Sequence, residues 1–146
     1  MDPAGDRPRK LFETGADGGA FALSWFDQGR QVAYIQRNKD GDSAMRRDLE
    51  GGPAITIFPP SEWKQYNDLT WLPDGRLIYG VPEPNGLHET NYWVRRLDPH
   101  TGRPVGGTKR LTNFSGSGMY SSSATSDGKR VAFVKQMLHF TGYVAD

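Results

Sequence analysis

The chain has 146 residues, enough for one domain that buries roughly two-thirds of its unfolded surface without disulfide staples. It has no cysteine, which excludes disulfides, thiolate metal sites and thiol nucleophiles. The absence of cysteine fits a reducing cytoplasm and a disulfide-free periplasm equally well. With 18 Lys+Arg against 17 Asp+Glu the net charge is +1, so nucleic acid is not an expected partner, and no apolar run is long enough to predict membrane insertion.

Short apolar segments between frequent turns indicate an all-β chain. The 18 glycines and 10 prolines separate segments that are rich in Val, Ile, Tyr, Trp and Phe. Such residues favour strands, because branched and flat side chains suit a pleated, half-buried surface. No window combines helical periodicity with helix caps, and Ser61 to Tyr66 is expected to form one turn within a loop.

Three segments repeat one another, each as a strand, a tight turn and a second strand. They are LSWFDQGRQVAYI at Leu23 to Ile35, LTWLPDGRLIYGV at Leu69 to Val81 and SATSDGKRVAFV at Ser123 to Val134. The predicted turn residues are Gly29, Asp74, Gly75, Asp127 and Gly128. Asp-Gly suits a hairpin turn because glycine adopts positive φ angles without steric cost. A repeat of about 50 residues fits the four-stranded blades of a β-propeller.

The other segments, taken in chain order, complete these units. We expect a disordered tail at 1–8, an outer strand at 9–13, and blades at about 21–58, 68–114 and 120–146. Third strands are expected at Ala44 to Leu49, Asn91 to Leu97 and Phe140 to Ala145, and fourth strands at Ile55 to Phe58 and Lys109 to Phe114.

This prediction amounts to a partial β-propeller of about two and three-quarter four-stranded antiparallel blades, with about twelve strands. A closed propeller needs 4 to 8 blades. We therefore expect a fragment of a longer protein or, alternatively, a piece that oligomerises to complete the ring. In either case, exposed blade edges are expected to favour self-association.

The repeats, with KRLTNF at Lys109 to Phe114 before the last one, resemble the TolB-type WD-like propeller repeat. Its signature is a tryptophan-containing strand, an SPDG-like turn and an RLT outer strand. The resemblance covers residues 9–146 and departs at FDQG in the first unit and at Ala124, which replaces the tryptophan found at Trp25 and Trp71. It implies a bacterial propeller of the kind found in periplasmic scaffold proteins, in prolyl-oligopeptidase-like enzymes and, most similar in style, in C-terminal regions of serine/threonine protein kinases.

Two sets of polar residues are candidate metal ligands. His88, His100 and His139 lack the close spacing of a zinc site and are expected to lie in solvent. NKDGDS, which begins at Asn38, alternates oxygen ligands at Asn38, Asp40 and Asp42 like a calcium loop, but Ser43 stands where such a loop requires glycine and Leu49 where it requires glutamate. A polar hairpin tip at residues 38–42 is the alternative to a calcium site.

No segment carries a catalytic motif. The serine-rich stretch at 115–126 lacks the lysine of a phosphate-binding loop and the G-x-S-x-G of a nucleophile elbow, and it is expected to connect two blades. Kinase motifs are missing, and no serine has a recognisable His/Asp pair. The sequence predicts a chain that is not itself an enzyme and that needs no cofactor.

Aromatic side chains are the best candidates for contacts with a partner. Most are expected to pack between blades because flat rings bury a large area there; these are Trp25, Trp71, Trp93, Tyr34, Tyr79, Tyr92 and Phe133. The exceptions are Trp63 and Tyr66 in the loop after the first blade, which we group with Met119 and Tyr120 as a candidate contact patch.

Two classes of function fit these observations. The first is a non-catalytic module that recognises a protein, peptide or other ligand, in the setting of a sensory region of a bacterial serine/threonine kinase. The second is the accessory propeller of a prolyl-oligopeptidase-like hydrolase whose catalytic domain lies outside this chain. Kinase motifs upstream would favour the first and a G-x-S-x-G segment downstream the second.

Overall fold

The computed structural model describes residues 9–16, 18–26, 29–62, 68–84, 89–98, 101–139 and 141–144. These residues form ten β-strands and no α-helix, which confirms the all-β prediction. All strand pairs are antiparallel, and neighbours in a sheet follow one another in the chain. The expected tail at 1–8 lies outside the described residues.

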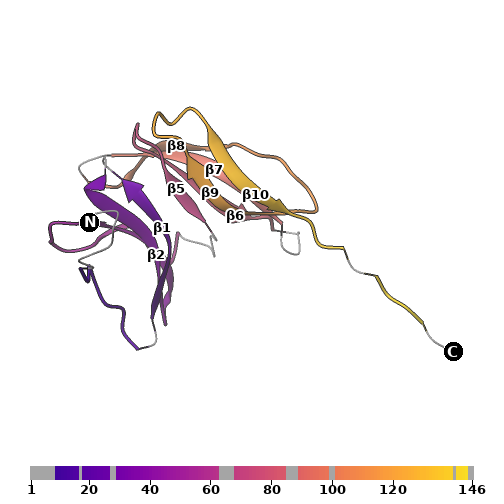
Figure 1. The fold of residues 1–146 in the computed structure, drawn as a ribbon, viewed down its shortest axis with the longest axis horizontal. Helices are drawn as coiled ribbons and strands as arrows, with labels where there is room; N and C mark the ends of the chain where they lie inside the picture. The colour runs from indigo at the N-terminus through magenta and orange to yellow at the C-terminus, as the bar shows by residue number, and fades with distance from the viewer. Residues whose placement is uncertain are drawn as a thin grey trace.

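The strands form two four-stranded sheets and a two-stranded sheet that lie side by side (Figure 1). The first blade contains β1 (Gly19–Phe26), β2 (Gln31–Asn38), β3 (Gly41–Asp48) and β4 (Ile55–Phe58). The second contains β5 (Leu69–Trp71), β6 (Arg76–Pro82), β7 (Thr90–Leu97) and β8 (Pro104–Arg110). The third consists of β9 (Gly118–Ala124) and β10 (Val131–Gln136). β1, β5 and β9 are the inner strands, and they contact one another in that order.

The first and third inner strands share a β-bulge, which supports the alignment of the repeats. In β1 the pairing with β2 shifts between Phe21 and Ser24, and in β9 the pairing with β10 shifts at the same place in the repeat. Each bulge holds a non-glycine residue in the left-handed region, Ala22 at φ 52° and Ser121 at φ 51°. A bulge leaves one residue out of the ladder, so its backbone groups are free to bind elsewhere.

Each blade has two faces because side chains alternate along a strand. We call the side nearer the next blade along the chain the forward face and the opposite side the rear face. Ile35 of β2, on the forward face of the first blade, shares a buried cluster with Leu77 and Tyr79 on the rear face of the second. Ile78 points the other way, into a cluster with Met119 of β9. The core therefore lies between blades rather than inside one sheet.

An aromatic contact recurs at the rear face of every blade. Tyr34 stacks on Phe12 with ring centroids 4.4 Å apart, and Tyr79 packs against Phe58 at 5.7 Å. In the third blade the equivalent contact joins Phe133 and Phe114 at 6.4 Å. In each case the phenylalanine comes from the segment that precedes the blade. Its ring packs on the outer part of the rear face of that blade.

Residues 9–13 are not the outer strand that the sequence predicts. A strand requires a neighbouring backbone to pair with, and this segment is held mainly by side chains instead. Arg9 donates a hydrogen bond to the carbonyl of Leu49, Arg47 donates one to the carbonyl of Leu11 at 3.1 Å, and the guanidinium of Arg47 lies over the ring of Phe12.

The predicted strand at Lys109 to Phe114 is also misplaced, since β8 spans Pro104–Arg110. The side chain of Asn91 takes over where the ladder ends, because its amide group binds both the N–H and the carbonyl of Phe114. The sequence pattern placed the strand at KRLTNF, but the strand ends at Arg110, and the N–H of Leu111 makes one further hydrogen bond to the carbonyl of Tyr92 in β7 at 2.8 Å.

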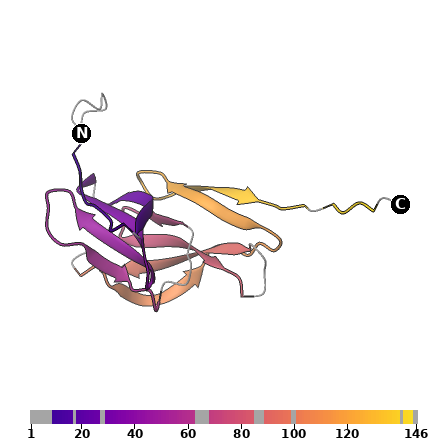
Figure 2. The same ribbon diagram turned by 90° about the horizontal axis from the view of Figure 1, so that it is seen from below.

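The third strand predicted at Phe140 to Ala145 is absent from the described residues 141–144. After β10 the chain runs away from the sheets (Figures 1 and 2). Tyr143 and Val144 are 91% and 95% exposed, so nothing in the described part of the chain holds this segment against β10. Phe140 and the last two residues lie outside the described residues.

Candidate ligand-binding groove

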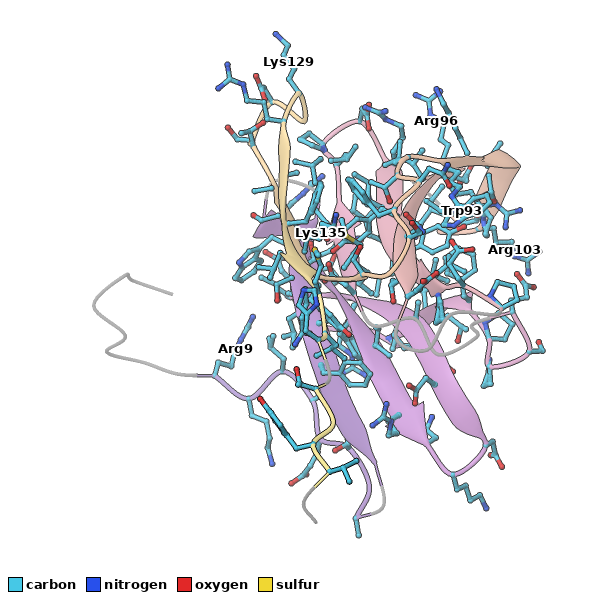
Figure 3. All side chains as sticks on the ribbon, turned by 90° about the vertical axis from the view of Figure 1, so that its right-hand side faces the viewer. Arg9, Trp93, Arg96, Arg103, Lys129 and Lys135 are labelled. Atoms are coloured by element: carbon cyan, nitrogen blue, oxygen red, sulfur yellow. The ribbon has the colours of Figure 1, made fainter. Side chains whose placement is uncertain are left out.

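A groove of about 850 Å³ lies at the end of the blades where the β1–β2, β5–β6 and β9–β10 turns meet. Residues from all three blades line it, among them Trp25, Trp71, Leu72, Arg96, Ala124 and Thr125. Figure 3 shows Arg96 and Lys129 at this end, both directed away from the sheets. Its lining combines apolar and aromatic side chains with a few polar groups, as ligand sites commonly do.

The repeat sequence accounts for the groove. Trp71 is on the rear face of the second blade and is 5% exposed, because the first blade covers it. Ala124 occupies the same register in the third blade, as its pairing with Val131 shows. An alanine there leaves open a volume that an indole fills at the preceding interface, and the groove extends past this position.

The turns at the rim of the groove are held by side chains and by glycine conformation. Gly29, Gly75 and Gly128 have φ angles of 84°, 83° and 67°. The carboxylate of Asp74 accepts a hydrogen bond from the backbone N–H of Arg76, and that of Asp127 accepts one from Lys129 at 3.0 Å.

Asp127 also accepts a hydrogen bond from the hydroxyl of Thr125, and this bond, followed by the one from Lys129, lowers the pKa of its carboxyl group. Both bonds favour the ionised form, so this carboxylate stays charged at the rim.

A second hollow, of about 430 Å³, lies between the three inner strands. The buried carboxylate of Asp68 lies at its wall, where Oδ2 accepts hydrogen bonds from the hydroxyl of Tyr92 at 2.7 Å and the N–H of Ser122 at 2.5 Å. Ser122 offers that N–H because it belongs to the bulge in β9. The hydroxyl of Thr70 donates to the carbonyl of Ser122 at 2.8 Å, so side chains bind both the N–H and the carbonyl of this residue.

Burial is the main reason that the pKa of Tyr92 is raised far above its usual value, and the hydrogen bond and the negative charge of Asp68 add to the effect. The tyrosine therefore remains a hydrogen-bond donor at neutral pH. The arrangement fastens the second blade to the third. Sequence reasoning missed Asp68 because a single carboxylate before a strand gives no periodic signal.

Asn91 forms another polar centre that the sequence did not indicate. It is fully buried, and its amide group also donates to Glu83 at 2.9 Å and accepts from the hydroxyl of Thr112 at 2.9 Å. Glu83 in turn accepts a hydrogen bond from Arg110 at 2.7 Å. These bonds hold the segment that connects β8 to β9. One buried asparagine therefore positions the chain where the third blade begins.

The structure separates the residues of the predicted contact patch. Met119 is 0% exposed and lies in the cluster between the second and third blades, so its assignment to an exposed patch is wrong. Tyr120, next to it in β9, is half-buried. Trp63 and Tyr66 lie outside the described residues, and their part of the patch stays a prediction.

Two of the aromatic residues expected in the core are instead exposed. Trp25 is 65% exposed and Phe133 is 38% exposed. Trp25 is on the rear face of the first blade, where no further blade covers it in the described structure. Phe133 still contacts Tyr92 and Phe114, but β10 forms the edge of its two-stranded sheet and leaves the ring partly in solvent.

The candidate metal ligands do not come together in the described part of the chain, which holds no group of three or more His, Asp or Glu side chains placed to bind a metal ion. Residues 38–42 form the tip of the β2–β3 hairpin, where the carboxylate of Asp42 is bound by the guanidinium of Arg37 at 2.9 Å. This is the polar hairpin tip that the sequence offered as the alternative. His88 and His100 lie outside the described residues.

Comparison with known proteins gives matches to solved structures. No family model and no curated protein sequence matches the chain. A putative TolB from Agrobacterium tumefaciens superposes with a TM-score of 0.62 over 82% of the chain at 15% identity, and TolB from Acinetobacter baumannii does so with a TM-score of 0.58 over 80% at 18% identity. The chain has the fold of part of a TolB-type β-propeller. This confirms the partial-propeller prediction.

The chain spans 39% and 26% of the lengths of these two TolB structures. At such identities the likeness concerns the fold, and the TolB-type blades position the groove without defining what it binds. Among the described residues, no helix has the length and apolar character needed to cross a bilayer.

Proposed function

We propose that the chain is a non-catalytic recognition module that binds a protein or peptide segment in the groove at the turn end of the blades. The observation that carries this proposal is the groove itself, which opens where Ala124 replaces the repeat tryptophan. An extended segment could place an apolar side chain against Trp71 and Leu72, with the exposed guanidinium of Arg96 beside it. Propellers commonly use such loop-lined ends, since turns tolerate sequence change while the sheets hold them in place.

The proposal is tested by filling the groove. Ala124→Trp restores the indole that the first two repeats carry, and Lys109→Trp adds the same side chain at an exposed position of β8 outside the groove. Peptides selected from a random phage-displayed library on the wild-type protein should bind Ala124→Trp at least about tenfold more weakly, about 1.4 kcal/mol, and Lys109→Trp with unchanged affinity.

Circular dichroism and thermal unfolding of both variants would show that the β-fold is retained. The proposal is wrong if the library yields no specific binder, or if the selected peptides bind the wild-type protein and Ala124→Trp equally well.

The setting of the module in a longer protein is a further proposal that rests on the resemblance of the repeats. A sensory region of a bacterial serine/threonine kinase is the setting that the repeat style favours, and an accessory propeller of a prolyl-oligopeptidase-like hydrolase is the alternative. Both settings require a catalytic domain outside this chain. The coding sequence upstream and downstream of the chain distinguishes the kinase from the hydrolase.

A further inference from the structure

The hollow between the three inner strands has a buried negative charge at its wall. It measures about 430 Å³, and Asp68, one of the residues that line it, is only 6% exposed. No Lys, Arg or His is among the described residues of this lining. A buried carboxylate is costly unless a cation or several hydrogen bonds compensate its charge. The described part of the lining supplies hydrogen bonds to Asp68 but no counter-ion.

The hydrogen bonds of Asp68 satisfy one of its two carboxylate oxygens. The hydroxyl of Tyr92 and the N–H of Ser122 both donate to Oδ2. Neither group carries a positive charge, since burial and the neighbouring carboxylate keep Tyr92 protonated and neutral. Among the described residues, none donates a hydrogen bond to Oδ1. Oδ1 is also not closed off from solvent, so it can accept a donor from a ligand in the hollow.

The hydroxyl groups beside Asp68 present an acceptor as well. A hydroxyl has one proton, and that of Thr70 is used in the hydrogen bond to the carbonyl of Ser122 at 2.8 Å. The hydroxyl of Ser122 is then the donor in its contact with the hydroxyl oxygen of Thr70, at 2.7 Å. Both protons are engaged, and the oxygen of Ser122 keeps lone pairs at the wall of the hollow. The site therefore fits a ligand group that only donates.

A primary ammonium group meets these requirements. It is a compact positive charge with three N–H donors and no acceptor. A guanidinium is also a cation that only donates, but it prefers to bind both oxygens of one carboxylate. Oδ2 of Asp68 already accepts two hydrogen bonds, so an ammonium at Oδ1 alone is the better match.

Contacts within the chain set the position of these groups. Asp68 and Thr70 lie at the start of the second blade and Ser122 lies in β9, and hydrogen bonds join the two segments directly. The bulge that holds Ser121 at φ 51° releases the N–H of Ser122 from the ladder for Asp68. Further blades in a longer protein would leave this contact in place.

We propose that the hollow binds a primary alkylammonium group, with Oδ1 of Asp68 and the hydroxyl oxygen of Ser122 as its acceptors. The ammonium group supplies the positive charge that the buried carboxylate lacks. It comes either from a free amine or from the lysine side chain of a partner. This site differs from the groove at the turn end of the blades, because Asp68, Thr70 and Ser122 do not line that groove.

NMR titration of the wild-type protein with small cations tests the chemistry of the site. Butylammonium chloride should shift the amide resonance of Ser122, whose N–H binds the same carboxylate, and should saturate in the millimolar range. Butyltrimethylammonium has the same charge but no N–H donor, and sodium chloride supplies a cation without an alkyl chain. At equal ionic strength, both should bind at least about tenfold more weakly than butylammonium.

Substitutions test the two acceptors. Asp68→Asn keeps one oxygen for Tyr92 and Ser122 but replaces Oδ1 by an N–H donor, so butylammonium should bind at least about tenfold more weakly. Ser122→Ala removes only the hydroxyl and should weaken binding about fivefold. Asp40→Asn is the matched control, since it makes the same change of charge at the exposed tip of the β2–β3 hairpin, and it should bind like the wild type.

A lysine derivative distinguishes the two sources of the ammonium group. Nα-acetyl-lysine methylamide should bind more tightly than butylammonium if the ligand is a lysine side chain, and more weakly if it is a free amine. The proposal fails if butylammonium does not bind the wild type, if butyltrimethylammonium binds as tightly, or if folded Asp68→Asn binds butylammonium as the wild type does. Circular dichroism shows whether each variant folds, and the wild-type titrations decide the question even if Asp68→Asn does not.

Discussion

Asp68 binds two groups from two neighbouring blades with one carboxylate oxygen. The hydroxyl of Tyr92 comes from its own blade, whereas the N–H of Ser122 comes from the bulge of β9. A carboxylate buried at 6% exposure requires such partners, because unpaired polar groups in the interior are costly. The inner hollow is therefore polar at its wall, although the blades on each side are held together by apolar clusters.

The Tyr92 hydroxyl predicts a change of stability with pH. Burial and Asp68 hold its pKa above the usual value near 10. The folded state thus keeps its proton where the unfolded state loses it, so this contribution is complete below about pH 10 and declines as pH rises above it. Tyr92→Phe should lower the free energy of unfolding by about 2 kcal/mol at neutral pH through loss of the hydrogen bond.

Urea unfolding of the wild type and Tyr92→Phe at pH values from neutral to strongly alkaline measures both effects. The difference between the two proteins should narrow above about pH 10, because the variant lacks the titrating hydroxyl. Tyr143→Phe is the control, since Tyr143 is 91% exposed. A constant difference across the whole range would show that the hydroxyl of Tyr92 does not titrate as inferred.

At the scale of residues, the sequence pattern identified the residues that share a repeat position. It did not identify the single polar residues that hold neighbouring segments together. The shared register of Trp25, Trp71 and Ala124 followed from spacing, and the structure places all three beside the groove. Asp68 and Asn91 gave no such signal, because their roles depend on partners 54 and 23 residues away, Ser122 and Phe114. Exposure of Trp25 was also unpredictable, since it depends on which blades are present.

At the scale of elements, the turn between β7 and β8 reaches from the second blade to the first. Gly102 has a φ of 70°, and its backbone N–H donates to the carbonyl of Asp98 at 2.8 Å. A Cβ atom added there would lie 2.9 Å from Nε of Arg46, which is only 2% exposed in β3. The turn therefore serves as an inter-blade contact as well as a connection.

Gly102→Ala should lower the free energy of unfolding by about 2 kcal/mol, because alanine is strained at positive φ and its methyl group would crowd a buried guanidinium. Gly107→Ala in β8 is the matched control, since no atom lies within 4 Å of its added Cβ. Chemical denaturation of both variants measures the difference. Equal stabilities would mean that the turn and Arg46 move apart without cost.

Strand positions followed from the sequence wherever a hairpin partner was nearby. The second and third strands of the first two blades lie close to where the repeats placed them, because each pairs with the next segment of the chain. Lys109 to Phe114 was misplaced because side-chain bonds from Asn91 compete with the ladder. A local pattern shows that a segment can form a strand, whereas its neighbours decide where pairing ends.

At the scale of the whole molecule, stability is expected to depend on contacts between blades, since the buried clusters lie at the two interfaces. Ile35 and Val134 test this directly, because they occupy the same repeat position in opposite surroundings, 0% and 56% exposed. Ile35→Ala should lower the free energy of unfolding by about 3 kcal/mol, through lost burial and the cavity left behind.

Val134→Ala should lower it by no more than about 0.5 kcal/mol in the single chain, since its side chain contacts mostly solvent. Urea unfolding of the wild type and both variants at low protein concentration would compare the two substitutions, so that contacts within one chain determine the result. If Val134→Ala proved as costly as Ile35→Ala under these conditions, the forward face of the third blade would be covered by the chain itself. The stability of each blade would then no longer follow from its neighbours along the chain.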